Sequence, residues 1–485
     1  MNWKLILKIQ GFLLIILASM MVAPLAFALY YRSSDIWALS ISMLITLALG
    51  TSFILAFKSQ KRIGTRESFV SVSMGWILAS VFGALPFYLH GSFGPYIDCV
   101  FEAMSGFTTT GATILTDIEA IPKGLLFWRS LTHWLGGMGI VLLTIAVLPT
   151  LGMSPGLLYR AEVPGPIKDR LKPKIKDTAK ILWLIYLFMT LLETLLLMVG
   201  GMNLYDALCH TFGTLATGGF STYSESVGGF KSTYIEVVII IFMYLAGINF
   251  TLHFYLVQGR LKDFFKDREW KFYTGVLVTG VVLISLNLYF SELPLYNDSY
   301  MRSLRDSAFQ VVSITTTTGY TTADFNLWPS FSSLLLVFLM FLGGSAGSTG
   351  GGIKQIRVLI ILKHLWHEVK KLVYPRAVFS LKVGDQIIDE DIVKNVLAFF
   401  MFFILFFAGI TLFLAFQGYD IVTSFSASIA TLGNIGPGLA RVGAVENYSF
   451  FDPYSKLLLI FAMLLGRLEI FSVLILMYSL VTRKR

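Results

Sequence analysis

Long apolar segments recur along the chain, and each is long enough to cross a lipid bilayer. A transmembrane helix needs about 20 mostly apolar residues, and the hydrophobic pattern supplies ten such segments. The first two form a hairpin, and the other eight form four successive pairs. We therefore predict transmembrane helices near residues 10–31, 36–57, 68–89, 124–149, 180–200, 233–257, 272–291, 330–360, 392–416 and 455–481.

The start of the chain resembles a signal peptide. Lys4 and Lys8 precede an apolar run, and the Ala-Phe-Ala sequence at residues 26–28 has the pattern of a cleavage site. The run from Gly11 to Tyr31 is nevertheless long enough to span a membrane, and a second apolar segment follows closely. We expect the first helix to be retained.

A short segment of common layout lies between the two helices of each pair. It begins with an Asp and leads, 12 or 13 residues later, to a glycine in a polar turn. Eleven helical residues extend only about 16 Å, which is too short to cross a core of about 30 Å. Each segment is therefore either re-entrant or outside the membrane. The pairs are Asp98 and Gly111, Asp206 and Gly218, Asp306 and Gly319, and Asp420 and Gly433.

Four copies of one motif, each between two paired helices, predict an all-α polytopic membrane protein. Its architecture would be four tandem repeats of helix, pore helix, filter loop and helix around one central pore, preceded by a two-helix hairpin. The predicted boundaries are 1–66 for the hairpin, 67–150 for repeat one, 151–259 for repeat two, 260–362 for repeat three with a Gly-rich intramembrane loop, and 363–485 for an amphipathic cytoplasmic segment and repeat four.

Composition and charge support a membrane protein and give its orientation. The chain is 55% hydrophobic, only 14% charged and has a mean hydropathy of +0.73, which excludes a soluble protein of this length. Lys and Arg gather after the second span, between the repeats and in the Arg483-Lys484-Arg485 tail, whereas the opposite loops hold few cations. By the positive-inside rule, both termini are cytoplasmic and all four turns open outward.

The four turns have the chemistry of a cation filter. A desolvated cation needs oxygen ligands in place of its water, and potassium channels supply rings of backbone carbonyls from Thr- and Gly-containing loops. The alternative is four ordinary external loops that follow N-capped helices. We expect K⁺ to bind the backbone carbonyls of Thr109, Thr110, Gly111, Ala112, Ala216, Thr217, Gly218, Gly219, Thr317, Thr318, Gly319, Tyr320, Thr431, Leu432, Gly433 and Asn434.

The pore helices would strengthen this cation site. We expect the Asp at the start of each short helix to be its N-cap. The helix would then direct its C-terminal end, the negative end of its dipole, toward the centre of the pore.

The span after Gly319 is interrupted by a run of small residues. Its apolar part, residues 330–342, would extend about 20 Å as a helix, so the run begins inside the membrane. We predict a gate loop there. The alternatives are a cytoplasmic linker and a phosphate-binding loop, although the required Gly-Lys-Ser/Thr ending is missing. The loop comprises Gly343, Gly344, Ser345, Ala346, Gly347, Ser348, Thr349, Gly350, Gly351 and Gly352.

Arg467 lies about midway along the last predicted span, with Glu469 two positions later. A charge at that depth costs at least about 3 kcal/mol on insertion scales, so it faces water or a partner. We interpret Arg467 as a barrier in a cation path. The alternative is an ion pair with Glu469 or another acid that only joins helices.

These features together resemble the Trk/Ktr/HKT superfamily of K⁺ transporters. The resemblance rests on the four glycine turns, on the Gly-rich break followed by Gly-Gly-Ile-Lys354, and on the Gly466-Arg467-Leu-Glu469 segment. The additional hairpin is similar to the Trk branch. The resemblance implies a bacterial inner-membrane protein that takes up K⁺, and Gly111 implies a K⁺ rather than an Na⁺ filter.

The resemblance also implies partners that the composition does not reveal. These are a second copy of the chain, in a homodimer with one pore in each protomer, and a cytosolic TrkA-like regulatory ring that binds NAD(H) or ATP/ADP. We expect no bound cofactor, because K⁺ is the substrate. A K⁺ uptake channel has two alternatives. A secondary transporter that couples K⁺ to H⁺ or Na⁺ remains the alternative, and an enzyme is disfavoured because no cluster of catalytic groups is found.

Overall fold

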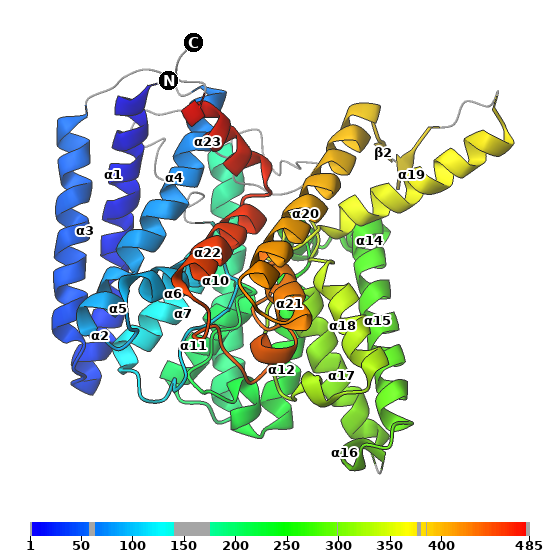
Figure 1. Ribbon diagram of the computed structural model, residues 1–485, viewed down its shortest axis with the longest axis horizontal. Coiled ribbons are helices and arrows are strands. Elements are labelled where there is room, and N and C mark those ends of the chain that lie inside the picture. The colour runs from blue at the N-terminus through cyan, green and yellow to red at the C-terminus, as the bar shows by residue number, and fades with distance from the viewer. Residues whose placement is uncertain are drawn as a thin grey trace.

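The computed structural model describes residues 2–57, 64–139, 175–297, 299–375, 380–384 and 386–481. They form a bundle of helices (Figure 1), and the one sheet among these residues is a two-stranded hairpin of β1 (Lys382–Val383) and β2 (Gln386–Ile387). The predicted all-α membrane fold agrees with this architecture. The second half of the predicted span 124–149, and the basic loop between repeats one and two, lie outside the described residues.

Six described helices are long and apolar enough to cross a membrane, and two bent helix pairs raise the number to eight. The remaining two of the ten predicted spans begin with α7 (Lys123–Gly137) and α18 (Ser330–Met340), which are shorter. The six long helices are Trp3–Tyr31, Ile36–Ala56, Arg66–His90, Ala179–Val199, Arg268–Tyr289 and Glu390–Phe416.

The N-terminal hairpin has two spans. The first is formed by α1 (Trp3–Met20) and α2 (Val22–Tyr31), and the second by α3 (Ile36–Ala56). Helices α1 and α3 are in close contact where Gly11 meets Gly50. A Cβ added to Gly11 would lie 2.8 Å from the Gly50 carbonyl oxygen. Small residues at such a crossing let two membrane helices approach, as the apolar lipid offers no hydrophobic driving force for their association.

Each repeat consists of a spanning helix, a short pore helix and a second helix. The pore helices are 12 to 16 residues long, or roughly 18–24 Å, so they reach only partway across a bilayer. The elements are α4 (Thr65–Gly83), α5 (Leu85–His90), α6 (Tyr96–Phe107) and α7 in repeat one; α10 (Ile175–Val199), α11 (Leu204–Leu215), α12 (Thr233–Ala246) and α13 (Phe250–Val257) in repeat two; α14 (Leu261–Lys266), α15 (Arg268–Tyr289), α16 (Pro294–Asn297), α17 (Tyr300–Thr315), α18 and α19 (Gln355–Val373) in repeat three; and α20 (Glu390–Phe416), α21 (Ile421–Leu432), α22 (Pro453–Arg467) and α23 (Phe471–Val481) in repeat four.

The second helix of every repeat ends inside the bundle, not only the one in repeat three. Helix α12 meets α13 at a bend of 101°, and α22 meets α23 at a bend of 115°. The predicted spans 233–257 and 455–481 are therefore each formed by two helices that meet at a sharp bend. At the second bend, Glu469 and Ile470 both adopt left-handed backbone angles, with φ of 52° and 59°. This conformation ends a helix because successive helical angles cannot continue through it.

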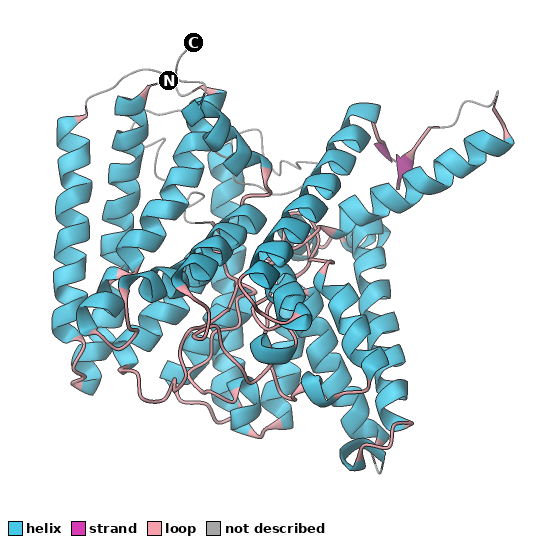
Figure 2. Cartoon of the chain, viewed as in Figure 1, coloured by secondary structure: helices cyan, strands magenta, loops and turns pink. Residues whose placement is uncertain are grey.

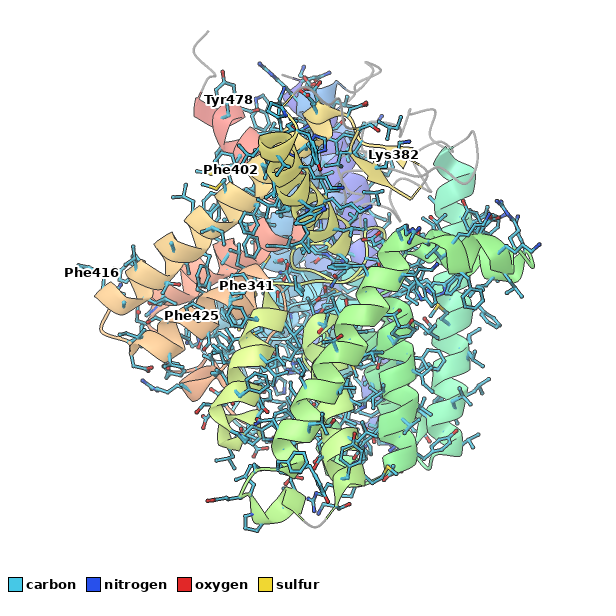
Figure 3. All side chains as sticks on the ribbon, turned by 90° about the vertical axis from the view of Figure 1, so that its right-hand side faces the viewer. Phe341, Lys382, Phe402, Phe416, Phe425 and Tyr478 are labelled. Atoms are coloured by element: carbon cyan, nitrogen blue, oxygen red, sulfur yellow. The ribbon has the colours of Figure 1, made fainter. Side chains whose placement is uncertain are left out.

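Helix α1 begins and α23 ends at the same end of the bundle (Figure 1). Helix α19 leaves the bundle near that end and extends sideways, with the β1–β2 hairpin beside it. Where α18 ends, the ring of Phe341 packs near Phe425, with ring centroids 6.5 Å apart, whereas Phe416 points outward (Figure 3). This aromatic contact joins repeat three to repeat four.

Candidate ion pathway

The four pore helices end in the same way, although their sequences differ. The residue after each C-cap has left-handed backbone angles, and the next N–H donates a 2.8 Å hydrogen bond back to a carbonyl five residues earlier. This is a common way for a helix to end, because it satisfies carbonyls that the last turn leaves unpaired. The left-handed residues are Thr109 (φ 54°), Thr217 (55°), Thr317 (61°) and Asn434 (55°).

A glycine with positive φ follows two residues after each of these positions. The angles are 79° at Gly111, 79° at Gly219, 80° at Gly319 and 96° at Gly436. The predicted register of the second and fourth turns was therefore wrong, since it placed Gly218 and Gly433 at these positions. Gly433 is the C-cap of α21 and has a helical φ of −79°.

The sequence contained a signal for the correct register in repeat two. The spacing from Asp206 to Gly219 is 13 residues, the same as from Asp98 to Gly111. In repeat four no such signal exists, because Gly433 has the expected spacing from Asp420 and the wrong conformation. The structure assigns the equivalent position to Gly436.

Each of these glycines lies against the backbone of the next repeat. A Cβ added to any of them would lie less than 3.0 Å from a carbonyl oxygen of that repeat, which is closer than real Cβ atoms approach. Gly111 contacts the carbonyl of Gly218, Gly219 that of Thr318, Gly319 that of Ile435, and Gly436 that of Thr110. The contacts run from repeat one through four and back to one, so the turns close into a ring.

The loops that form this ring converge in the middle of the bundle (Figure 2). Side chains hold their backbone in place. The Asn434 side-chain amide donates to the Thr110 hydroxyl at 3.0 Å, which connects turn four to turn one. The Tyr320 hydroxyl is within 3.0 Å of the His210 carbonyl and 3.1 Å of the Phe220 carbonyl, which connects turn three to repeat two.

The predicted N-caps were correct in only one of the four pore helices. Asp420 caps α21 by accepting from the Thr423 N–H at 2.9 Å, and hydrogen bonds from Thr423 hold the pKa of Asp420 below its usual value. Asp98 and Asp206 are instead in the first turn of their helices, and Asp306 lies farther into α17. All four helix C-termini still point at the ring, so the helix dipoles place partial negative charge there.

Hollows lie on both sides of the ring. One hollow is lined by residues of all four turns, including the four positive-φ glycines. The other is lined by the broken ends of the second helices and by the loop at 343–352, among them Gly137, Gly350, Gly466 and Arg467. We call the first the outer mouth and the second the inner cavity, after the orientation predicted from the sequence, and the ring lies between them.

The loop at 343–352 is non-helical, largely buried and bonded to the underside of the ring. The Thr317 hydroxyl accepts from the Gly351 N–H at 2.7 Å, and the Thr349 hydroxyl donates to the Leu215 carbonyl at 2.9 Å. Lys354, also buried, donates to the Gly350 carbonyl. These contacts are incompatible with an exposed cytoplasmic linker, and helix α18, not a strand, precedes the loop.

Arg467 lies where the ring, the loop and α7 meet. Its guanidinium donates to the Thr109 hydroxyl at 3.0 Å, to the Thr349 carbonyl at 2.7 Å and to the carbonyls of Gly136 and Gly137 at 2.5 and 3.0 Å. Both Gly136 and Gly137 are in the last turn of α7, where carbonyls lack their full set of helical partners, and the Gly136 carbonyl also accepts from the Gly139 N–H at 3.0 Å. Glu469, suggested from the sequence as its ion-pair partner, pairs with Arg357 at 2.5 Å.

The structure also reveals a polar residue that the sequence analysis missed. Glu269, in the first turn of α15, is buried. One of its oxygens accepts from the N–H groups of Ala346 and Ile356, at 2.7 and 2.9 Å. One carboxylate thus holds the loop and the start of α19 together. Its position before a long apolar helix gave no sign of this, because an acid there is ordinary at a helix N-terminus.

Comparison with known proteins agrees with this geometry. The sequence profile of the family TrkH, described as "Cation transport protein", matches residues 37–482. The chain belongs to the TrkH family. It is 42% identical over 482 residues to the Trk system potassium uptake protein TrkH of Salmonella typhimurium, covering 98% of each chain. It is 40% identical to the protein of the same name from Halomonas elongata, covering 100% of each.

A solved structure gives the same result for the fold. The crystal structure of the potassium transporter TrkH from Vibrio parahaemolyticus matches with a TM-score of 0.88 and 36% identity, covering 100% of both chains. The predicted fold class and the resemblance to the Trk branch are confirmed. These relatives are named as potassium transport proteins, which agrees with the expectation that the TrkH-family chain is not an enzyme.

The register of turn four leads to a testable difference between two glycines. We expect Gly436→Ala to lower the K⁺/Na⁺ permeability ratio on the order of tenfold, because alanine costs about 1–2 kcal/mol in left-handed backbone and its Cβ would collide with the Thr110 carbonyl. Gly433→Ala should have a smaller effect, because its φ is helical and its added Cβ would meet the Ile429 carbonyl of its own helix at 2.8 Å, not a carbonyl of the neighbouring turn. Reversal potentials of purified protein in planar bilayers measure both. Equal effects would contradict the assigned register.

Proposed function

We propose that this chain forms a K⁺-selective pore that takes potassium into the cell across the bacterial inner membrane, with both termini in the cytoplasm. The observation that carries the proposal is the closed ring of backbone carbonyls from Thr110, Gly218, Thr318 and Ile435. Such a ring offers a desolvated cation oxygen ligands from four sides. The names of the relatives, which are potassium uptake proteins, support the choice of ion.

The arrangement around the ring can stabilise a desolvated K⁺ and favour its entry into the cell. The carbonyls replace water, and the C-terminal ends of four pore helices place partial negative charge near the ring. A potential that is negative inside contributes about 2.3 kcal/mol per charge for each 100 mV, which favours uptake. Parallel repeats around one ring favour a pore over a coupled carrier, since coupled carriers are commonly built from inverted repeats.

Single-channel recording tests this function. Purified protein in a planar bilayer, with K⁺ on one side and Na⁺ on the other, should give discrete openings whose reversal potential follows the K⁺ gradient. Uptake into liposomes that requires an H⁺ or Na⁺ gradient, without discrete openings, would instead show a secondary transporter that couples K⁺ to one of these ions.

The inner side of the pore would be closed by the loop at 343–352 together with Arg467. The loop lies directly beneath the ring through the Thr317 and Leu215 contacts, and Arg467 presents a positive charge to the inner cavity. A fixed cation in the path raises the free energy of a passing K⁺. Both elements would have to move for ions to pass.

We also propose that the pore works as a homodimer and is regulated by a cytosolic TrkA-like ring that binds NAD(H) or ATP/ADP. Support comes from helix α19, which begins directly after the loop and extends out of the bundle (Figure 1). A partner that pulls on α19 would act on the loop through Ile356 and Glu269. The family resemblance supplies the identity of the partner.

Neutralising Arg467 should increase transport. We expect Arg467→Gln to raise K⁺ flux on the order of tenfold, which corresponds to a barrier lower by about 1.4 kcal/mol. Flux of ⁸⁶Rb⁺ or K⁺ into liposomes measures it, with the exposed Arg260→Gln as control. A properly inserted variant with unchanged flux would refute the barrier role.

Releasing the loop from Glu269 should also increase transport. Glu269→Ala removes the acceptor of two backbone N–H groups, and buried donors without partners cost about 1–3 kcal/mol, so the closed loop should lose stability. We expect open probability to rise about fivefold or more. Glu269→Gln keeps an acceptor oxygen and should remain close to the original protein. Equal single-channel records for the two variants would argue against the anchor.

A further inference from the structure

A buried ion pair lies behind the first two filter turns. Glu102 of α6 and Arg129 of α7 are 2.6 Å apart, and their side chains are 0% and 1% exposed. Moving charges out of water costs several kcal/mol for each ion, and an apolar pair of similar size is often as stable. A pair in this position therefore calls for an explanation other than stability.

Each member of the pair holds a different turn. The Glu102 carboxylate accepts from the Thr113 hydroxyl at 2.8 Å and from the Ile114 N–H at 2.9 Å. Arg129 donates to the Ser221 carbonyl at 3.0 Å, and its guanidinium carbon lies 3.5 Å from the centre of the Phe220 ring. Thr113 is two residues after Gly111, and Ser221 is two residues after Gly219. The pair thus connects the segment that follows Gly111 in turn one to the segment that follows Gly219 in turn two.

The equivalent positions in the other repeats carry weaker links. Glu102 is seven residues before the left-handed Thr109, and the corresponding residues are His210, Gln310 and Ala427. His210 is 3.0 Å from the Ser221 hydroxyl, and Gln310 donates to the Ala323 carbonyl at 3.5 Å. Among the described residues, an ion pair occurs at this position in repeat one only.

We propose that Glu102 and Arg129 are positioning residues that fix turn one against turn two and thereby set the selectivity of the filter for K⁺ over Na⁺. The proposal rests on the proposed filter function. The planar guanidinium matters because it donates to the carboxylate and to Ser221 at once, in directions that a lysine ammonium cannot reproduce. A small displacement of either turn changes the spacing between the carbonyls of Thr110 and Gly218.

Two simpler roles predict different results. If the pair served only stability, variants would melt earlier and keep their selectivity. Arg129 also lines the outer mouth, so its role could be only electrostatic. In that case a variant that keeps the charge would keep the K⁺/Na⁺ selectivity. Arg129→Lys separates these roles because it retains the charge and loses the second donor.

The test measures K⁺/Na⁺ permeability ratios of the full-length protein in planar bilayers, together with melting temperatures. Arg129→Lys and Glu102→Gln should lower the ratio about three- to tenfold, the equivalent of one lost hydrogen bond. The matched control Arg260→Lys, in an exposed ion pair, should change nothing. If the single variants do not insert, the double variant Glu102→Leu with Arg129→Met, which leaves no unpaired buried charge, is measured and should show the same loss.

The positive control is Gly436→Ala. If it lowers the ratio and the pair variants do not, the positioning role is refuted and the filter stands. If Gly436→Ala leaves the ratio unchanged as well, the filter assignment itself fails. A lower ratio in Arg129→Lys, with the melting temperature unchanged, would support the positioning role.

Discussion

The tightest steric constraint in this protein is the contact of four glycines with carbonyl groups of the neighbouring repeat. No side chain fits at Gly111, Gly219, Gly319 or Gly436, and each has a backbone conformation that favours glycine. Because each contact joins one repeat to the next, the four pore helices must end at a common point. The spanning helices are arranged around that point, since a short pore helix within the membrane has to be enclosed by protein.

Below the ring, backbone polar groups inside the membrane must again be paired or enclosed by protein. All four second helices end or bend inside the bundle, and each end leaves carbonyl groups that lipid cannot satisfy. Side chains take that role: Arg467 at the end of α7, Gln355 at the Gly343 carbonyl, and Lys354 at Gly350. The upper part of the pathway is therefore held by backbone contacts. The lower part is held by long side chains, which can change partners.

Three buried or largely buried ion pairs lie along the pathway. Arg129 is neutralised by Glu102, Arg357 by Glu469, and Lys456 by Asp98 at 2.8 Å. These pairs connect elements from different repeats or different helices of one repeat. Ionised side chains in a low-dielectric interior are tolerated only with such partners. Two of the three pairs lie at interfaces between repeats: Arg357–Glu469 joins repeat three to repeat four, and Lys456–Asp98 joins repeat four to repeat one.

The sequence by itself determined the membrane class, the four repeats, the short pore helices and the Gly-rich loop in repeat three. These depend on the length of apolar segments and on local turn chemistry, which act over a few neighbouring residues. Gly111 and Gly319 were found in this way because Thr-rich turns surround them. The 13-residue spacing from Asp206 also pointed to Gly219. Only the tertiary structure decided that Gly436 completes the ring, that every second helix ends or bends inside the bundle, and that Glu269 holds the loop. These features arise from contacts between residues up to several hundred positions apart, as between Gly436 and Thr110, and no local pattern encodes such contacts.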